Sequence, residues 1–170
     1  MKMNVDHLMV GSIDNNLSDE IVALIKPEHY DYNPIRSTMG NLEQTKSVML
    51  RYFDSYSNAG SAEYRKHFLD TELMPIYKEY VDKLLIELGK HYKFTDYMCF
   101  IAMLVPHGKV GMHIDNAPFL DECHRIHIPM KTNENVFYII EDNKYHWQKN
   151  GIYEFDNKRI HGVENNSDEE

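Results

Sequence analysis

A segment in the last third of the chain carries side chains that bind metals and anions. In VGMHIDNAPFLDECHRIHIPMKTN, residues 110–133, His113 and Asp115 form an H-x-D unit. Residues i and i+2 of a β-strand point to the same face, so this imidazole and this carboxylate are expected to approach one point. A third ligand must come from elsewhere, and His161 in DNKRIHGVEN is the candidate. Two histidines and one carboxylate on one face of an ion leave its other positions open, the arrangement of non-haem Fe(II) oxygenases.

The spacing alone leaves a second interpretation open. An H-x-D unit occurs by chance in many chains, and a distant histidine adds little specificity. In that interpretation His113 and Asp115 are an exposed strand pair, and His161 is a loop histidine with satisfied hydrogen bonds.

Arg125 and His127 form another pair at i and i+2, in HRIHIPM. They are expected to share one strand face, with the neighbouring isoleucines on the opposite face and His124 at the surface. An inward-facing arginine needs an anion, and its guanidinium fork suits the carboxylate of a substrate or co-substrate. The alternative is a salt bridge to Glu122 or to another acid at the sheet edge.

The first part of the chain is expected to be rich in helix. SDEIVALIKP predicts a short helix capped by Ser18, SVMLRYF predicts a strand, and the most helical region runs over residues 61–88. Pro75 is expected to open or kink its second half, and Gly89 to end it. An apolar stripe at helical spacing predicts a packing surface there, made of Ile76, Tyr77, Tyr80, Val81, Leu84, Leu85 and Leu88.

From Tyr92 onward, short β-rich runs alternate with turns, which predicts an antiparallel sandwich or barrel rather than βαβ units. We therefore expect one domain over residues 1–170. Residues 1–91 would be its helix-rich support, and residues 92–170 its jelly-roll core. The runs are YMCFIAMLV, KVGMHID, HRIHIPM, NVFYIIE, YHWQ, IYEFDN and RIHGVEN.

Composition excludes some classes of partner. A net charge of -9 argues against a nucleic-acid backbone as the main partner, although part of it lies in the tail ENNSDEE, expected to be a solvated end. No apolar run approaches membrane-spanning length. Two cysteines, Cys99 and Cys123, do not suggest a disulfide framework, so a cytoplasmic location is expected.

Three phrases, in order, resemble the aspartyl/asparaginyl β-hydroxylase family of Fe(II)/2-oxoglutarate-dependent dioxygenases, whose scaffold is similar to that of bacterial proline hydroxylases. They are LVPHGKVGMHID, RIHIPMKTNENVFY and GIYEFDNKRIHGVENNSDEE. The resemblance covers roughly Tyr97 to the end. It implies a mainly β fold with N-terminal helices: a double-stranded β-helix (jelly roll, cupin-like) with an iron site at its open end.

Carried over by motif, His113, Asp115 and His161 would be the Fe(II) ligands, and Asp115 completes the full triad. Arg125 and His127 match an R-x-H pair that contacts a carboxylate of 2-oxoglutarate or of the substrate. The phrase FDN, residues 155–157, is expected to shape the strand end before His161.

The resemblance implies hydroxylation of a C–H bond in a small molecule or peptide that bears a carboxylate, either an amino acid or an Asp/Asn/Pro-type residue. Fe(II), 2-oxoglutarate and O₂ would be the cofactor and co-substrates. The alternative is a non-catalytic or 2-oxoglutarate-independent metal-binding jelly-roll protein. The sequence makes no prediction of oligomeric state.

The sequence departs from the family pattern at two points. An arginine that pairs with the far carboxylate of 2-oxoglutarate would be the residue after Glu170, where the given sequence stops. We expect the natural chain to continue with this arginine and a closing strand; the alternative is a site defective in 2-oxoglutarate binding. A hydroxyl residue that assists the same carboxylate is replaced by Ala102, and Lys109 is a candidate substitute.

Overall fold

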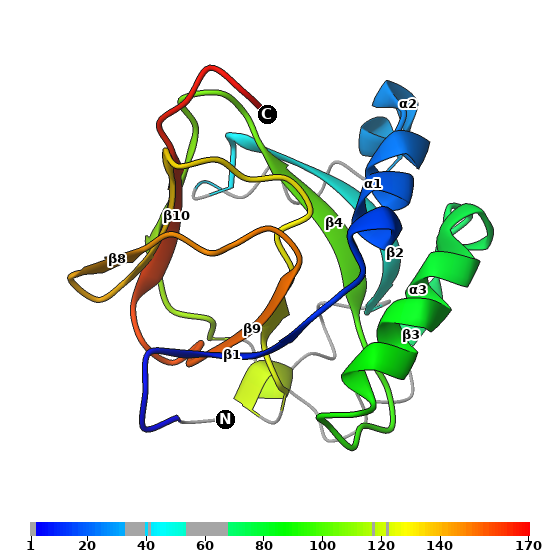
Figure 1. The fold of residues 1–170 in the computed structure, drawn as a ribbon, viewed down its shortest axis with the longest axis horizontal. Helices are drawn as coiled ribbons and strands as arrows, with labels where there is room; N and C mark the ends of the chain where they lie inside the picture. Colours follow the sequence, from blue (N-terminus) through cyan, green and yellow to red (C-terminus); the bar gives the residue numbers. More distant parts are fainter. Residues whose placement is uncertain (1–2, 33–39, 41, 54–67, 117, 122) are drawn as a thin grey trace.

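Three antiparallel sheets make up most of the fold (Figure 1). The computed structural model describes residues 3–32, 40, 42–53, 68–116, 118–121 and 123–170. The sheets have the strand orders β1-β9-β6, β5-β10-β7-β8 and β3-β2-β4. The strands are β1 (His7–Ser12), β2 (Thr45–Phe53), β3 (Phe68–Asp70), β4 (Cys99–Leu104), β5 (Lys109–His113), β6 (Ile126–His127), β7 (Val136–Ile140), β8 (Asn143–Tyr145), β9 (Gly151–Phe155) and β10 (His161–Asn165).

The predicted class, mainly β with antiparallel pairing, is confirmed, whereas a closed barrel is not seen. Within the described part of the chain the three sheets remain separate. Strand β4 pairs only with β2, and β6 pairs only with β9, so each forms an edge of its sheet. Closure of a barrel requires every strand to have two neighbours. The described strands therefore form an open structure.

The helices α1 (Asn15–Leu24), α2 (Pro27–Asp31) and α3 (Met74–Leu88) lie on the side of the β3-β2-β4 sheet (Figure 1). Asp14 caps α1, because its Oδ1 accepts a hydrogen bond from the amide of Asn16 at 2.7 Å. The prediction of Ser18 as the cap was wrong: Ser18 is buried inside the helix and donates to the carbonyl of Asn15. The earlier start brings Leu17 and Ile21 onto one face, where both pack into the core.

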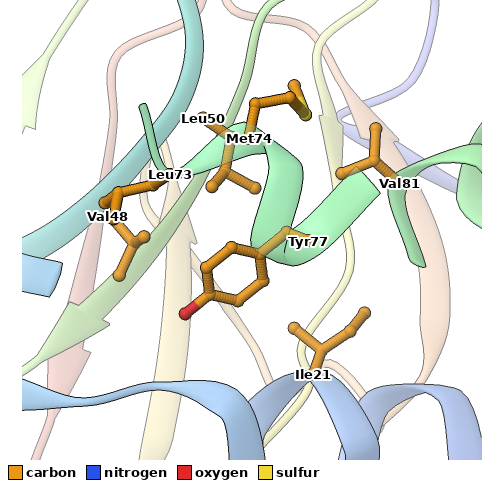
Figure 2. Packing of buried hydrophobic residues seen from close by; sticks show 7 residues of the cluster. All are labelled: Ile21, Val48, Leu50, Leu73, Met74, Tyr77 and Val81. Atoms are coloured by element: carbon orange, nitrogen blue, oxygen red, sulfur yellow. The ribbon is translucent and has the colours of Figure 1, made fainter. Parts of the chain in front are cut away.

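The core between the helices and the sheet confirms most of the apolar stripe (Figure 2). Tyr77 and Val81 of α3 pack with Ile21 of α1 and with Val48 and Leu50 of β2. Pro75 opens α3 and Gly89 is its C-cap, as predicted. Ile76, however, is 45% exposed, because it lies on the face of α3 that turns away from the sheet.

Several predicted elements differ from the structure. The helical region expected over residues 61–88 begins only at Met74; residues 54–67 lie outside the described part, and Phe68–Asp70 is strand β3. Strand β1 was not predicted. It pairs with β9, and these partners are far apart in the sequence. The tail is not simply solvated: Asn165 is buried and donates a hydrogen bond to the carbonyl of Glu169 at 2.7 Å.

No helix among the described residues is both long and apolar enough to cross a membrane.

Candidate metal centre

Two strands of the four-stranded sheet bring the two histidines together. His113 ends β5, His161 begins β10, and the two residues are direct partners in the antiparallel register. Their ring centroids are 4.4 Å apart. Because partners in an antiparallel pair share a face, the two imidazoles converge although 48 positions separate them along the chain.

Asp115 joins them from the loop that follows β5. One ligand atom from each of His113, Asp115 and His161 lies within 4.8 Å of the others. Asp115 Oδ1 is 3.7 Å from His113 Nε2. The structure thus brings the three predicted ligands together. Asp115 is not part of the strand, however, so alternation along β5 does not by itself place it.

Backbone carbonyls orient both imidazoles. His113 Nδ1 lies 2.8 Å from the carbonyl oxygen of Gly111, and His161 Nδ1 lies 2.8 Å from that of Arg159. A carbonyl only accepts, so each Nδ1 carries the proton and each Nε2 keeps its lone pair for a metal ion. Burial lowers the pKa of His161 below its usual 6.5, and the Arg159 carbonyl and Asp115 oppose part of that effect.

Asp115 faces Arg125 as well as the histidines. The side chain of Asp115 is 11% exposed, and its Oδ2 lies 3.3 Å from Nε of Arg125. Both atoms are buried, and neither makes a hydrogen bond with the described residues. Asp115, which pairs with Arg125, is therefore also a candidate metal ligand. Glu122, the partner considered for Arg125 from the sequence, lies outside the described residues. An unsatisfied carboxylate oxygen beside two free Nε2 atoms suits a divalent cation.

A cavity of about 890 Å³ lies next to Arg125, although none of the three candidate ligands lines it. Arg125 and His127 both line it, together with aromatic and apolar side chains that include Phe100, Met103 and Tyr138. His127 packs against Phe155 at 5.0 Å between ring centroids, and Phe155 packs against His161 at 4.8 Å. Arg125 thus contacts the candidate ligand Asp115 on one side and the cavity on the other.

Other predicted residues take different places. His124 is at the surface, as expected, but its Nδ1 lies 2.7 Å from Oε1 of the buried Glu154. Ala102 lines the cavity, whereas Lys109 is exposed and does not. Trp147 is buried core, stacked on Tyr138 and Tyr153.

Sequence reasoning missed Lys158, one of two residues that hold the backbone of Asp115. Lys158 Nζ donates to the carbonyl of Asp115 at 2.8 Å, and the amide of Asp115 donates to the carbonyl of Asn157 at 3.2 Å. Both residues stand in DNKRIH, shortly before His161. Their position shortly before the candidate ligand His161 is a signal that the sequence offers. The sequence does not reveal, however, that they contact the loop that carries Asp115.

Fold and site together define a class of protein: an antiparallel β scaffold that gathers two histidines and one carboxylate beside a cavity, as non-haem iron oxygenases do. A family profile described as aspartyl/asparaginyl beta-hydroxylase matches residues 20–170, and the chain belongs to this family. The family consists of Fe(II)/2-oxoglutarate-dependent hydroxylases, so the protein is an enzyme of that type.

The match confirms the predicted family, and it covers more of the chain than the resemblance recognised from Tyr97 onward. It includes the helical part of the chain from residue 20, in which no signature was recognised from the sequence. A comparison with curated proteins found no match to this chain.

Proposed function

We propose that this chain hydroxylates a C–H bond of a carboxylate-bearing small molecule or peptide, either an amino acid or an Asp/Asn/Pro-type residue. His113, Asp115 and His161 hold Fe(II) in this proposal. The observation that carries it is the convergence of their ligand atoms within 4.8 Å of one another, beside a cavity that Arg125 lines. A nucleic-acid partner is not part of the proposal, in keeping with the net charge of -9.

The three side chains fit Fe(II) in type and state. Each histidine commits Nδ1 to a carbonyl, which leaves Nε2 available, and Asp115 Oδ2 is buried without a hydrogen bond to the described residues. When bound, Fe(II) with 2-oxoglutarate and O₂ supplies the oxidant that converts C–H to C–OH, with succinate and CO₂ as co-products. The protein orients the ligands, and side chains such as Phe100 and Tyr138 exclude water.

Arg125 and His127 are proposed to bind a carboxylate in the cavity. The Arg125 side chain is 19% exposed, and Asp115, its ion-pair partner among the described residues, would also be shared with the metal ion. A buried guanidinium whose partner is shared in this way is incompletely neutralised, which favours a second anion. Either 2-oxoglutarate or the substrate can supply it.

Residues 1–170 are proposed to form one domain with the double-stranded β-helix architecture. Support comes from pairing between the two parts expected from the sequence: β1 pairs with β9, and β2 pairs with β4. In the described structure the edges β4 and β6 each lack a second neighbour, and both strands line the cavity.

The proposal is tested by anaerobic spectroscopy. Addition of Fe(II) and then 2-oxoglutarate to the metal-free protein is expected to give a metal-to-ligand charge-transfer band in visible light. His113→Ala should abolish the band, whereas His146→Ala, a change at an exposed histidine, should keep it. With O₂, carboxylate-bearing amino acids or peptides should trigger succinate release, and the methyl esters of those carboxylates should not.

The same measurements are repeated on a chain extended beyond Glu170. A band in neither protein would overturn the proposal, and so would an unchanged band in His113→Ala. Succinate release that the methyl esters trigger as well as the acids would overturn the carboxylate requirement alone.

A further inference from the structure

Asp115 depends on loop contacts for its position. The two histidines lie on paired strands, whereas Asp115 lies between the end of β5 and the short 3-10 helix η4 (Pro118–Asp121). A loop residue has no sheet ladder to hold it. Whatever holds this loop must therefore place the carboxylate.

The turn before His161 supplies these contacts. Asn157 accepts a hydrogen bond from the amide of Asp115 at 3.2 Å and donates from Nδ2 to the carbonyl of Leu120 at 3.0 Å. Lys158 donates from Nζ to the carbonyl of Asp115 at 2.8 Å and forms an ion pair with Asp121. Two adjacent residues thus hold both ends of the segment from Asp115 to Asp121.

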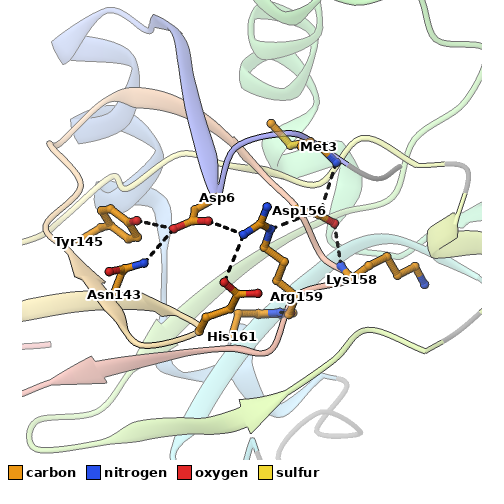
Figure 3. A network of polar contacts seen from close by, with 9 residues as sticks. Met3, Asp6, Asn143, Tyr145, Asp156, Lys158, Arg159 and His161 are labelled. Carbon is orange, nitrogen blue, oxygen red and sulfur yellow. Dashed lines mark hydrogen bonds and ion pairs between the residues drawn. The ribbon is translucent and has the colours of Figure 1, made fainter.

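Lys158 is itself fixed in place. Its amide donates to Oδ1 of Asp156 at 3.0 Å, and Asp156 is 1% exposed (Figure 3). The Lys158 side chain is 30% exposed. An ammonium that donates to a carbonyl from a fixed backbone is a stronger constraint than an ion pair between two exposed side chains.

We propose that Lys158 is a positioning residue for the metal site: its contact with the carbonyl of Asp115 fastens the carboxylate ligand to the turn that precedes His161. This inference rests on the proposed function, because it takes Asp115 and His161 as ligands. Residues that orient metal ligands from outside the coordination sphere typically change metal affinity by about 10- to 100-fold when altered. Lys158 acts on Asp115 through the backbone carbonyl of Asp115, and it is not proposed as a metal ligand.

The test measures Co(II) binding to the full, metal-free chain by calorimetry and by the visible spectrum of bound Co(II). Lys158→Met is expected to weaken Co(II) binding about 10-fold and to shift the spectrum toward that of Asp115→Ala. Lys158→Arg, which keeps a cationic donor, should recover most of the affinity and the original spectrum.

Two variants separate positioning from ion pairing. Asp121→Asn removes the ion pair but leaves the carbonyl contact, and it should bind Co(II) nearly as the unchanged protein does. Lys144→Met removes a comparable ion pair, to Glu164, and should leave both affinity and spectrum unchanged. A Co(II) affinity of Lys158→Met equal to that of Lys144→Met would overturn the proposal.

His113→Ala shows which proposal fails. If it loses Co(II) binding while Lys158→Met keeps the original affinity and spectrum, the positioning role is wrong and the metal site stands. If His113→Ala itself binds Co(II) as before, the proposed metal site is wrong, and the positioning role falls with it. A Lys158→Met variant that fails to fold is replaced by Lys158→Gln, with the same expectation.

Discussion

The three candidate ligands are held by different means. Each histidine is fixed by a carbonyl two residues earlier in its own chain segment, at Gly111 or Arg159. The carboxylate of Asp115 instead faces Arg125, and only its backbone is hydrogen-bonded to the turn at Asn157 and Lys158. A metal ion would therefore meet two preset nitrogen ligands and one carboxylate whose position depends on a loop.

At the scale of one residue, Gly162 allows β10 to lie close to β5, because it has no side chain. A Cβ added there would lie 2.7 Å from the carbonyl oxygen of Val110 and 2.9 Å from Met112 Sδ. The backbone oxygen cannot move without disturbing the pairing that sets His161 against His113. Gly162→Ala is expected to lower the free energy of unfolding by about 1–3 kcal/mol, measured by urea denaturation, and to weaken Co(II) binding.

Gly40→Ala is the matched control, because among the described residues the nearest atom to its added Cβ is Glu43 Oε1 at 4.0 Å. Equal stability of the two variants would show that the β5–β10 contact tolerates a methyl group.

At the scale of elements, the N-terminal segment supports the turn that leads into His161. The amide of Met3 donates to Asp156, and Asp6 accepts from Arg159 Nη1 at 2.7 Å (Figure 3). Asp6 also accepts from the hydroxyl of Tyr145 at 2.5 Å. These first residues lie before residue 20, where the family match begins. This chain thus uses a segment outside the matched region to hold the turn beside its candidate metal site.

Of the three described carboxylates that contact Arg159, Asp6 and Glu141 are expected to differ in their contribution to stability. Asp6 is 18% exposed and accepts three hydrogen bonds, whereas Glu141 is 48% exposed and lies 3.2 Å from the guanidinium. Asp6→Asn should lower the free energy of unfolding by about 2 kcal/mol. Glu141→Gln should lower it by less than about 1 kcal/mol, as for an exposed ion pair. Urea denaturation checks both, and similar losses would contradict this ranking.

At the scale of the whole molecule, two hydrophobic clusters of described residues serve different parts of the protein. One joins the helices to the β3-β2-β4 sheet, and the other contains Ile140, Trp147, Tyr153 and Phe155. The second lies beneath the site, because Phe155 contacts His161. His7 packs at its edge, 4.3 Å from Tyr145 between ring centroids, and its Nδ1 is buried without a hydrogen bond to the described residues.

The half-buried His7 should make stability depend on pH. Burial lowers the pKa of His7 below 6.5, an effect that Asp6 only partly opposes. The unfolded chain then binds a proton more readily than the folded one, so this contribution is complete above about pH 6.5 and declines as pH falls toward the lowered pKa. Urea denaturation at about pH 8 and about pH 5 should show a smaller pH dependence for His7→Phe than for the unchanged protein.

His146→Phe, at an exposed position, serves as the control and should keep the original pH dependence. An unchanged pH dependence in His7→Phe would show that protonation of His7 does not contribute.

Elements with a strong local pattern were predictable. The strand over SVMLRYF, the helix that Pro75 opens and Gly89 ends, and most of the short antiparallel strands of the last third occur. The run YHWQ is an exception: it is strand only at Tyr145, where β8 ends. Their signals are periodicity and caps, which act over a few residues. Strand β1 was missed and β3 was taken for helix, because β1 is defined by its pairing with β9 and β3 by its pairing with β2. Such pairings between distant segments leave little local trace.

The sequence by itself determined which side chains are available for metal chemistry and the family to which the chain belongs. Residue types and their order carry that information, and His113, Asp115 and His161 were selected from it. Only the tertiary structure decided how they are held. The β5–β10 register aligns the histidines, and contacts from Asn157 and Lys158 place the loop of Asp115. These contacts join segments about 40 residues apart, and their geometry exists only once the sheets have formed.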